Sequence, residues 1–353
     1  MSPKPTYTAE NLYSGSGKTD LPHGYDIRQD NFQDCYYIAV LGATADRQPD
    51  RIKDAIRYDA AKGSFFVSLY EEKDGKPSKR EIEVTQADIK ENIALGGGGT
   101  ADNTGKNTPI WPSVMEAAFA KTRDSNPADG LAEGYNAIGG GWSRQAMYAL
   151  TGEKGTDIGL AEANTLGSDK VFERVRDAIG EGRAVTLSTD PEPGAKQDGL
   201  NDNHVYMVNR IYKDDAGKVM VELRNPYARN DYVGEGLDKK SATVDVKLDD
   251  LLSTGGFEEI NIGPARAAGK TKAATESGKT GSANFDKLLD NLSDPAKTGE
   301  MLRKFAQSPE AESFRRDGKE QFQQRETQER NAAAPAQQEP APAQEPPVRA
   351  RGM

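Results

Sequence analysis

The chain has 353 residues, 35% of them hydrophobic, which is enough for a hydrophobic core and for two domains of ordinary size. Its net charge of −10 argues against a nucleic-acid partner, because neutralising phosphates requires a basic surface. A single cysteine excludes an internal disulfide framework.

The N-terminal region has neither the pattern of a signal peptide nor an apolar run long enough to cross a bilayer. We therefore expect no membrane span, and a protein that is cytoplasmic or secreted without a cleavable signal peptide. Residues 1–20 are polar and are predicted to be a flexible lead-in. Apolar residues recur at helical spacing over residues 35–45, which predicts a helix that begins at Cys35 and is capped by Asp34.

Two segments that alternate apolar and polar residues, 65–71 and 81–85, flank a Lys-Asp-Gly-Lys turn and predict an exposed hairpin. The glycine-rich stretch 96–108 is predicted to be a mobile loop, and it lacks the flanking strand and Lys-Ser/Thr of a phosphate-binding loop. Apolar stripes then predict three helices, at residues 112–122, 143–152 and 168–180.

The periodicity changes after Gly182, where β-branched and aromatic residues become frequent. The strand candidates in this part are residues 184–189, 204–212, 219–224, 242–248 and 257–262. They predict an antiparallel sheet or barrel of about five strands, and thus an α+β fold in which a helical part precedes a β part.

The pattern divides the chain into five parts. They are a flexible N-terminus (1–20), a helical subdomain (21–182), a β subdomain (183–263), a linker with a weakly helical extension (264–331) and a disordered Ala/Pro/Gln tail (332–353).

Four residues form a candidate catalytic set. Cys35 begins a helix, a position that favours a thiolate nucleophile. Of the two histidines, His204 opens an apolar strand and is the better candidate base, whereas His23 lies in a loop-like segment. Asn225 ends the partner strand of the same hairpin and would orient His204. The amide of Gln29 and the Cys35 backbone N–H would stabilise an oxyanion.

Each of these residues also has an ordinary structural interpretation. A lone cysteine in an apolar helix is commonly an inert buried thiol, and a strand histidine is commonly structural. Asn-Pro is a frequent turn signal. The joint arrangement is what favours catalysis, because a sole cysteine at a helix start coincides with a histidine and an asparagine paired through a hairpin.

Several segments in order resemble the catalytic core of the calpain family, over roughly residues 24 to 262. They are YDIRQDNFQDCYYIAVLGATA, WPSVMEAAFAK, GYNAIGGGWSRQAMYALTG, NHVYMVNRIYKDDAGKVMVELRNPYARNDYVG and VKLDDLLSTGGFEEINI. Three residues depart from the family pattern: Tyr36 replaces a tryptophan, Asn203 replaces a glycine, and Tyr227 replaces the tryptophan that shields the His/Asn pair.

This resemblance implies a papain-like fold and a Cys35/His204/Asn225 triad with Gln29 in the oxyanion hole. It also implies calcium control, with candidate carboxylate ligands at Asp26, Asp231 and Asp238, although acidic residues are frequent here and solvated surface charge is the plainer interpretation. No cofactor is required for the chemistry itself.

The expected function is a cysteine endopeptidase that acts on proteins or peptides through a thioester acyl-enzyme. One alternative keeps the fold and changes the reaction to acyl transfer, deamidation or cell-wall peptide hydrolysis. Another is a catalytically silent binding module. The absence of an EF-hand loop and the Ala/Pro/Gln tail suggest a microbial effector whose tail binds a partner or a secretion apparatus.

Overall fold

The computed structural model describes residues 6–15, 21–101, 108–189, 200–230, 241–254 and 256–266. The chain divides into two units, Met1–Ala267 and Ala268–Met353, and the second lies outside the described residues. The predicted extension and tail therefore lie outside them as well, except for residues 264–266.

Most helices of the described part belong to the first half of the chain. They are η1 (Ala9–Asn11), η2 (Gly24–Asp26), α1 (Cys35–Arg47), α2 (Pro49–Ala55), α3 (Gln86–Leu95), α4 (Trp111–Lys121), α5 (Ala132–Ala137), α6 (Ser143–Thr151), α7 (Leu160–Leu166), α8 (Ser168–Gly180) and α9 (Leu248–Thr254). Within the described ranges, none of these helices has the length and apolar character that crossing a bilayer requires.

The strands form two separate antiparallel sheets. They are β1 (Ile56–Asp59), β2 (Ser64–Lys73), β3 (Lys76–Val84), β4 (Thr156–Gly159), β5 (Val185–Thr189), β6 (Val205–Lys213), β7 (Val219–Arg224), β8 (Thr243–Lys247) and β9 (Phe257–Ile262). The smaller sheet has the order β1-β2-β3 and the larger one β4-β9-β5-β6-β7-β8. Helices and antiparallel sheets together confirm the predicted α+β class.

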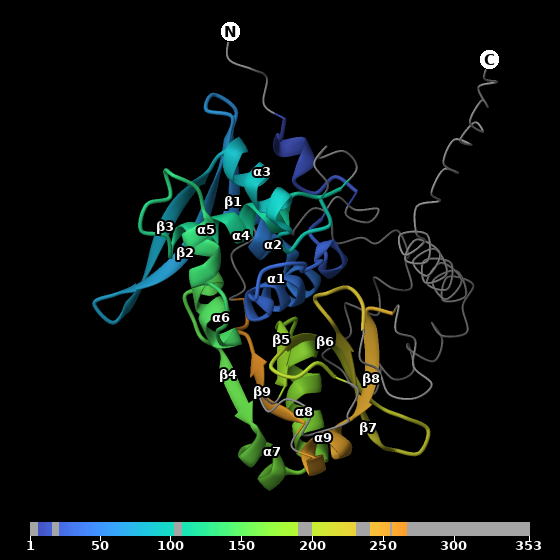
Figure 1. Cartoon of the computed structure of the whole chain (residues 1–353). Helices are drawn as coiled ribbons and strands as arrows, with labels where there is room; N and C mark the ends of the chain where they lie inside the picture. The colour runs from blue at the N-terminus through green and yellow to red at the C-terminus, as the bar shows by residue number, and fades with distance from the viewer. Residues whose placement is uncertain are drawn as a thin grey trace, which may run out of the picture. The chain divides into compact units, whose positions relative to one another are not determined.

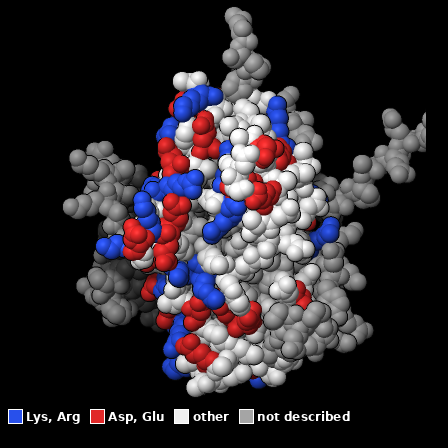
Figure 2. Space-filling view, turned by 60° about the vertical axis from the view of Figure 1, so that its left-hand side comes forward, with Lys and Arg blue, Asp and Glu red and all other residues white. Residues whose placement is uncertain are grey.

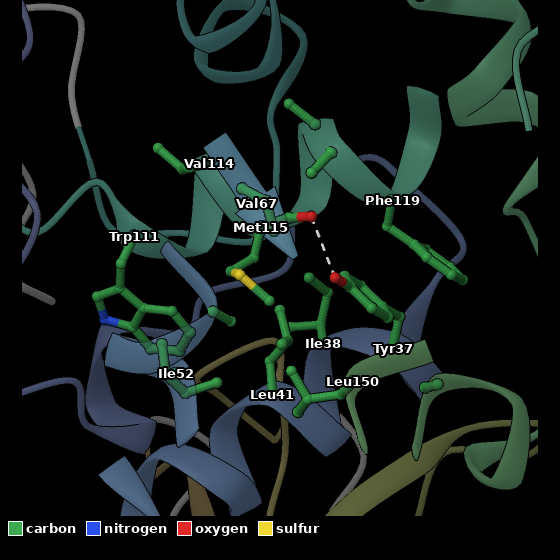
Figure 3. Packing of buried hydrophobic residues seen from close by; sticks show 14 of the residues in the cluster. Tyr37, Ile38, Leu41, Ile52, Val67, Trp111, Val114, Met115, Phe119 and Leu150 are labelled. Carbon is green, nitrogen blue, oxygen red and sulfur yellow. Dashed lines mark hydrogen bonds between the residues drawn. The ribbon is translucent and has the colours of Figure 1, made fainter. Parts of the chain in front are cut away.

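Helix α1 lies between helices α4 and α6 and the larger sheet (Figure 1), and it contacts α4 and α6 on one side and β5 and β6 on the other. Its residues from Tyr36 to Ala45 are all buried, so the helix is apolar around its whole circumference and not only along the predicted stripe. Tyr37 stacks on Phe119 with ring centroids 4.0 Å apart and donates a 3.0 Å hydrogen bond to the Met115 carbonyl (Figure 3). Helix α1 is thereby held firmly at the centre of the helical core.

The predicted hairpin is confirmed as strands β2 and β3, joined by a two-residue turn. Asp74 and Gly75 form this turn with φ angles of 54° and 72°, which is the left-handed geometry of a tight hairpin turn. On this sheet, Arg57 pairs with Glu81 and Arg80 with Glu71. Positive and negative side chains are interspersed on the face shown in Figure 2, so that face presents no field of a single sign.

The larger sheet has six strands where about five were expected. The additional strand is β4, a four-residue segment that pairs with β9 and is too short to show an alternating pattern. Within the described residues, β4 and β8 form the two edges of the sheet, which is therefore open there and not a closed barrel.

The buried side chains form two clusters, and the chain passes from the first cluster to the second before residue 182, where the subdomain boundary was expected. One cluster of buried side chains runs from Tyr7 to Leu150 and adds Ala184, Val205 and Met207, whereas the second begins at Ile158. Helix α8 contacts β5 and β6, so it packs with the β part although its sequence is helical. Packing partners, which periodicity does not reveal, assign α7 and α8 to the second cluster.

Candidate active site

The three residues of the expected triad lie at the ends of regular elements. Cys35 is the first residue of α1, His204 immediately precedes β6, and Asn225 immediately follows β7. Antiparallel pairing of β6 with β7, in which Met207 lies opposite Arg224, brings His204 and Asn225 to the same end of the hairpin.

The imidazole of His204 contacts the side chain of Asn225 directly. His204 Nε2 lies 2.9 Å from Asn225 Oδ1, and both side chains are buried. The Asn225 amide nitrogen donates to Asn230 Oδ1 at 3.2 Å, and Asn230 in turn donates to the Ser241 carbonyl at 2.9 Å. Because Asn230 presents an oxygen to Asn225, the Asn225 oxygen must face His204. His204 therefore carries its proton on Nε2, which leaves Nδ1 free to accept one.

Several contacts hold the ring and backbone of His204. Tyr227 stacks on the ring with centroids 4.5 Å apart and planes 18° apart, which covers the hydrogen bond to Asn225. Tyr206 meets the ring edge-on at 5.1 Å. Thr189 accepts a 2.9 Å hydrogen bond from the His204 backbone N–H and donates one from its own N–H to the His204 carbonyl at 2.8 Å. Sequence reasoning missed Thr189 and Asn230, because neither carries a motif of its own.

Gln29 is held on a segment that other parts of the chain fix in place. Its backbone N–H donates to the Pro226 carbonyl at 2.8 Å, beside Asn225, and the N–H of Arg28 donates to the Gly98 carbonyl at 2.9 Å. A Cβ at Gly98 would lie 2.3 Å from the Ile38 side chain, so a larger residue would require that buried side chain to move. The expectation of a mobile loop is thus wrong for residues 96–99, whose glycines pack against the Gln29 segment.

Cys35, His204 and Gln29 line one cavity of about 510 Å³. Its walls are completed by Gln33, Gly140, Gly141, Trp142, Ser188, Thr189, Asn203, Val205, Tyr227 and Glu258. Asn225 is fully buried behind His204 and does not reach the cavity. Cys35, His204 and Gln29 therefore border one cavity, and Asn225 contacts His204 from outside it.

Burial favours the neutral forms of both Cys35 and His204. Burial raises the pKa of the Cys35 thiol to about 11, against a hydrogen bond from the Val205 backbone that lowers it. Burial also lowers the pKa of His204 to about 4, against the hydrogen bond to Asn225 that raises it. At neutral pH the site thus holds a thiol and an uncharged imidazole, and His204 can act as a base.

Asp34 does not cap α1 as expected, since its side chain makes no capping hydrogen bond. Its carboxyl group is fully buried, where Oδ1 accepts a 3.3 Å hydrogen bond from Gln29 Nε2. Packing of α1 against the other helices turns this side chain inward, and local sequence preference could not reveal that.

Of the three residues proposed for calcium, only Asp26 lies in the described part of the chain. One oxygen of the buried Asp26 carboxylate accepts hydrogen bonds from Trp111 Nε1 at 2.6 Å and from the His23 backbone at 2.9 Å, so this carboxylate is occupied as a structural acceptor. Asp231 and Asp238 lie outside the described residues. Among the described residues, no three His, Cys, Asp or Glu side chains gather as metal ligands, and calcium binding stays a prediction.

Comparison with known proteins identifies the family of this chain. The calpain-type cysteine protease DEK1 of Arabidopsis thaliana is 27% identical over 128 residues, a stretch that covers 35% of this chain and 6% of that relative. The family model described as "Calpain family cysteine protease" matches residues 18–250, a span that contains Gln29, Cys35, His204 and Asn225. This chain belongs to the calpain family of cysteine proteases.

Proposed function

We propose that this chain is a cysteine endopeptidase that hydrolyses peptide bonds through a thioester acyl-enzyme. The observation that carries the proposal is the 2.9 Å contact between His204 Nε2 and Asn225 Oδ1, placed behind a cavity that Cys35 and Gln29 also line. A histidine held in this way presents the unprotonated Nδ1 to its surroundings, which is what a thiol nucleophile needs from its base.

The proposed reaction proceeds in two halves. In the first, His204 Nδ1 takes the Cys35 proton while Sγ attacks the carbonyl carbon, and the oxyanion accepts hydrogen bonds from the Cys35 N–H and the Gln29 amide. The C–N bond then breaks, and His204 gives its proton to the departing amine. In the second half, His204 deprotonates a water molecule that attacks the thioester, and the returning proton restores the Cys35 thiol.

The cavity wall suits an extended polypeptide. Gly140 and Gly141 expose backbone on one side, and nothing lies within 4 Å of a Cβ built at Gly140. Such a bare backbone can approach the main chain of a substrate closely. We also propose that the two parts of the fold correspond to the papain-like arrangement, with Cys35 from the helical part facing His204 from the β part.

Hydrolysis of a fluorogenic casein by the purified chain and by Cys35→Ala tests this function, each with calcium and with a chelator. We expect hydrolysis that falls at least about 10³-fold in Cys35→Ala, because Cys35 is the only thiol of the chain and a thioester cannot form without it. Residual activity in the variant comparable to the unmodified chain would refute the thiol mechanism. Hydrolysis that is lost when the chelator replaces calcium would support calcium control, which stays a prediction.

A silent binding module is the second candidate, and the neutral thiol and imidazole favour it, because a pKa of about 11 leaves little thiolate at neutral pH. Labelling of Cys35 by a peptide-like thiol reagent separates the two. Labelling that is lost in His204→Ala supports the enzyme. No labelling and no hydrolysis would support the binding module. Acyl transfer, the other alternative reaction, would appear as an amide product when an amine acceptor is added to the assay.

The roles expected for residues 264–353 in export or partner binding, and the identification as a microbial effector, stay predictions. Residues beyond 266 lie outside the described part of the chain. The described start of this segment packs on the protease part, since Arg266 pairs with Asp54 at 2.5 Å and Gln48 donates to the Pro264 carbonyl at 3.2 Å. The boundary between the protease part and a C-terminal part with a separate role is therefore expected after residue 267 and not at residue 264.

A further inference from the structure

A second cluster of buried polar side chains lies beneath the start of α1, outside the triad. It consists of Gln29, Asp34, Asn92 and Glu116, all of them buried. Glu116 Oε2 accepts hydrogen bonds from Asn92 Nδ2 at 2.5 Å and from the Gly98 backbone at 2.8 Å. On the other side, Asp34 Oδ1 accepts from Gln29 Nε2. The reaction scheme above uses neither carboxyl group.

One oxygen of each carboxyl group lacks a hydrogen-bond donor. Asp34 Oδ2 and Glu116 Oε1 are buried, and neither accepts a hydrogen bond from another group in the described structure. The two carboxyl groups are neighbours, since each acts on the pKa of the other. A proton on one of the two groups would supply the missing donor and remove the repulsion between two buried negative charges.

The electrostatic surroundings lead to the same result. Burial raises the pKa of Asp34 well above its usual value, and the neighbouring Glu116 raises it further. Burial also raises the pKa of Glu116, against the hydrogen bonds from Asn92 and Gly98 that lower it. Among the described residues, the groups that act on either carboxyl include no lysine, arginine or histidine. The titratable neighbours that the two carboxyls influence are Cys35, Tyr36, Tyr37, Tyr135 and Tyr227, none of which is a cation.

The hydrogen-bond pattern assigns the proton to Asp34. Glu116 accepts two N–H donors on one oxygen, as a carboxylate does, whereas Asp34 accepts a single, long hydrogen bond. We propose that Asp34 and Glu116 are positioning residues that share one proton, carried by Asp34 Oδ2 and donated to Glu116 Oε1, and that this neutral Asp34 keeps the Gln29 amide and the Cys35 thiol competent for chemistry.

The consequence for Gln29 follows from its two amide hydrogens. One donates to the Phe32 carbonyl at 2.6 Å and the other to Asp34 at 3.3 Å. The hydrogen bond to Asp34 is the longer of the two, so it is the one that an oxyanion would replace. A protonated Asp34 is a weaker acceptor than an aspartate anion, so it competes less for this hydrogen.

The consequence for Cys35 is electrostatic. A negative charge on Asp34, the preceding residue, raises the pKa of the thiol and would oppose both the thiolate and the oxyanion. Sharing one proton leaves the pair with a single charge, and that charge resides on Glu116, the more distant member, which is anchored to the loop that holds the Gln29 segment. The inference rests on the proposed thiol chemistry of Cys35.

Two isosteric variants separate this role from simple packing. Asn at position 34 imitates the protonated aspartate, since its amide can donate to Glu116 and its oxygen can accept from Gln29. Gln at position 116 removes the charge and supplies a donor, so Asp34 becomes ionised. We therefore expect Asp34→Asn to resemble the unmodified chain, and Glu116→Gln to raise the pH midpoint of Cys35 alkylation by about one unit and to lower kcat about tenfold with little change in KM.

Infrared spectroscopy tests the proton itself. At neutral pH the unmodified chain should show the C=O band of a protonated carboxyl, and labelling the aspartate side-chain carboxyl carbon with a heavy isotope should shift it. This measurement needs no substitution, so it holds even if a variant fails to fold. Absence of that band, or an alkaline shift of alkylation in Asp34→Asn but not in Glu116→Gln, would overturn the proposal.

The readouts also distinguish this inference from the proposed function. If the band and the alkylation shift are found but casein is not cleaved, the carboxyl pair stands and the endopeptidase assignment fails. If casein is cleaved through Cys35 but no protonated aspartate is found, the endopeptidase stands and the carboxyl pair fails.

Discussion

Asn225 offers the sharpest test of the candidate site, because its side chain links three groups. It accepts hydrogen bonds from His204 Nε2 and from the Tyr227 backbone, each at 2.9 Å, and donates to Asn230. In Asn225→Ala the buried Nε2–H of His204 loses its acceptor, which costs about 1–3 kcal/mol if the histidine keeps its orientation. If this cost destabilises the transition state and not the free enzyme, kcat/KM decreases about 5- to 150-fold.

The assay is casein hydrolysis by Asn225→Ala, with Asn209→Ala as the matched control. Asn209 lies in the same sheet and its side chain donates to Glu222 at 3.1 Å, away from the cavity. The control should retain full activity. Activity of Asn225→Ala within about twofold of the unmodified chain, while Cys35→Ala is inactive, would show that the His204 contact does not support catalysis.

Asn225→Asp extends the same test to charge. A carboxylate in place of the amide still accepts from Nε2 and favours the imidazolium, so the pKa of His204 should rise from about 4. Because the chain has two histidines, an NMR titration with His23→Gln for assignment follows this value directly. A pKa of His204 that is unchanged in Asn225→Asp would contradict the described contact.

The remaining predictions concern stability and the limits of the protease part. The pKa of His204 in the folded chain is about 4, below its usual 6.5. The free energy of unfolding should therefore decrease as the pH falls from 6.5 towards 4, by at most about 3 kcal/mol. Chemical denaturation at several pH values should show this decrease in the unmodified chain but not in His204→Gln. Gly98→Ala should lower the melting temperature by several degrees, because the added Cβ would clash with Ile38 of α1. Gly180→Ala is the control, because the space around Gly180 is open. Equal melting temperatures of the two variants would contradict the described packing of the loop. Deletion of residues 268–353 should leave casein hydrolysis intact, and loss of hydrolysis in that variant would show that the second unit is needed. Deletion of residues 264–353 also removes the contacts of residues 264–266, so it should lower the melting temperature.

Local patterns predicted several elements correctly because their causes are local. The helical period over residues 35–45 identified α1, and the Asp-Gly turn identified the β2–β3 hairpin. The same kind of reasoning failed for Asp34, whose position before a helix suggested a cap. Whether a carboxyl group caps a helix or is buried against Glu116 depends on how α1 packs on α4, and sequence spacing carries no information on that.

By itself, the sequence determined which groups are present for chemistry and in which order they occur. It contains one thiol at a helix start, and a histidine and an asparagine that the β6–β7 hairpin must bring near each other, since strand pairing follows from a short turn. Only the tertiary structure decided how Asn230 sets the proton position on His204, why a thiol and an imidazole remain neutral, and that two carboxyl groups meet where the described residues supply no cation. Burial and contacts between distant segments control these properties, and neither is encoded at any single position of the chain.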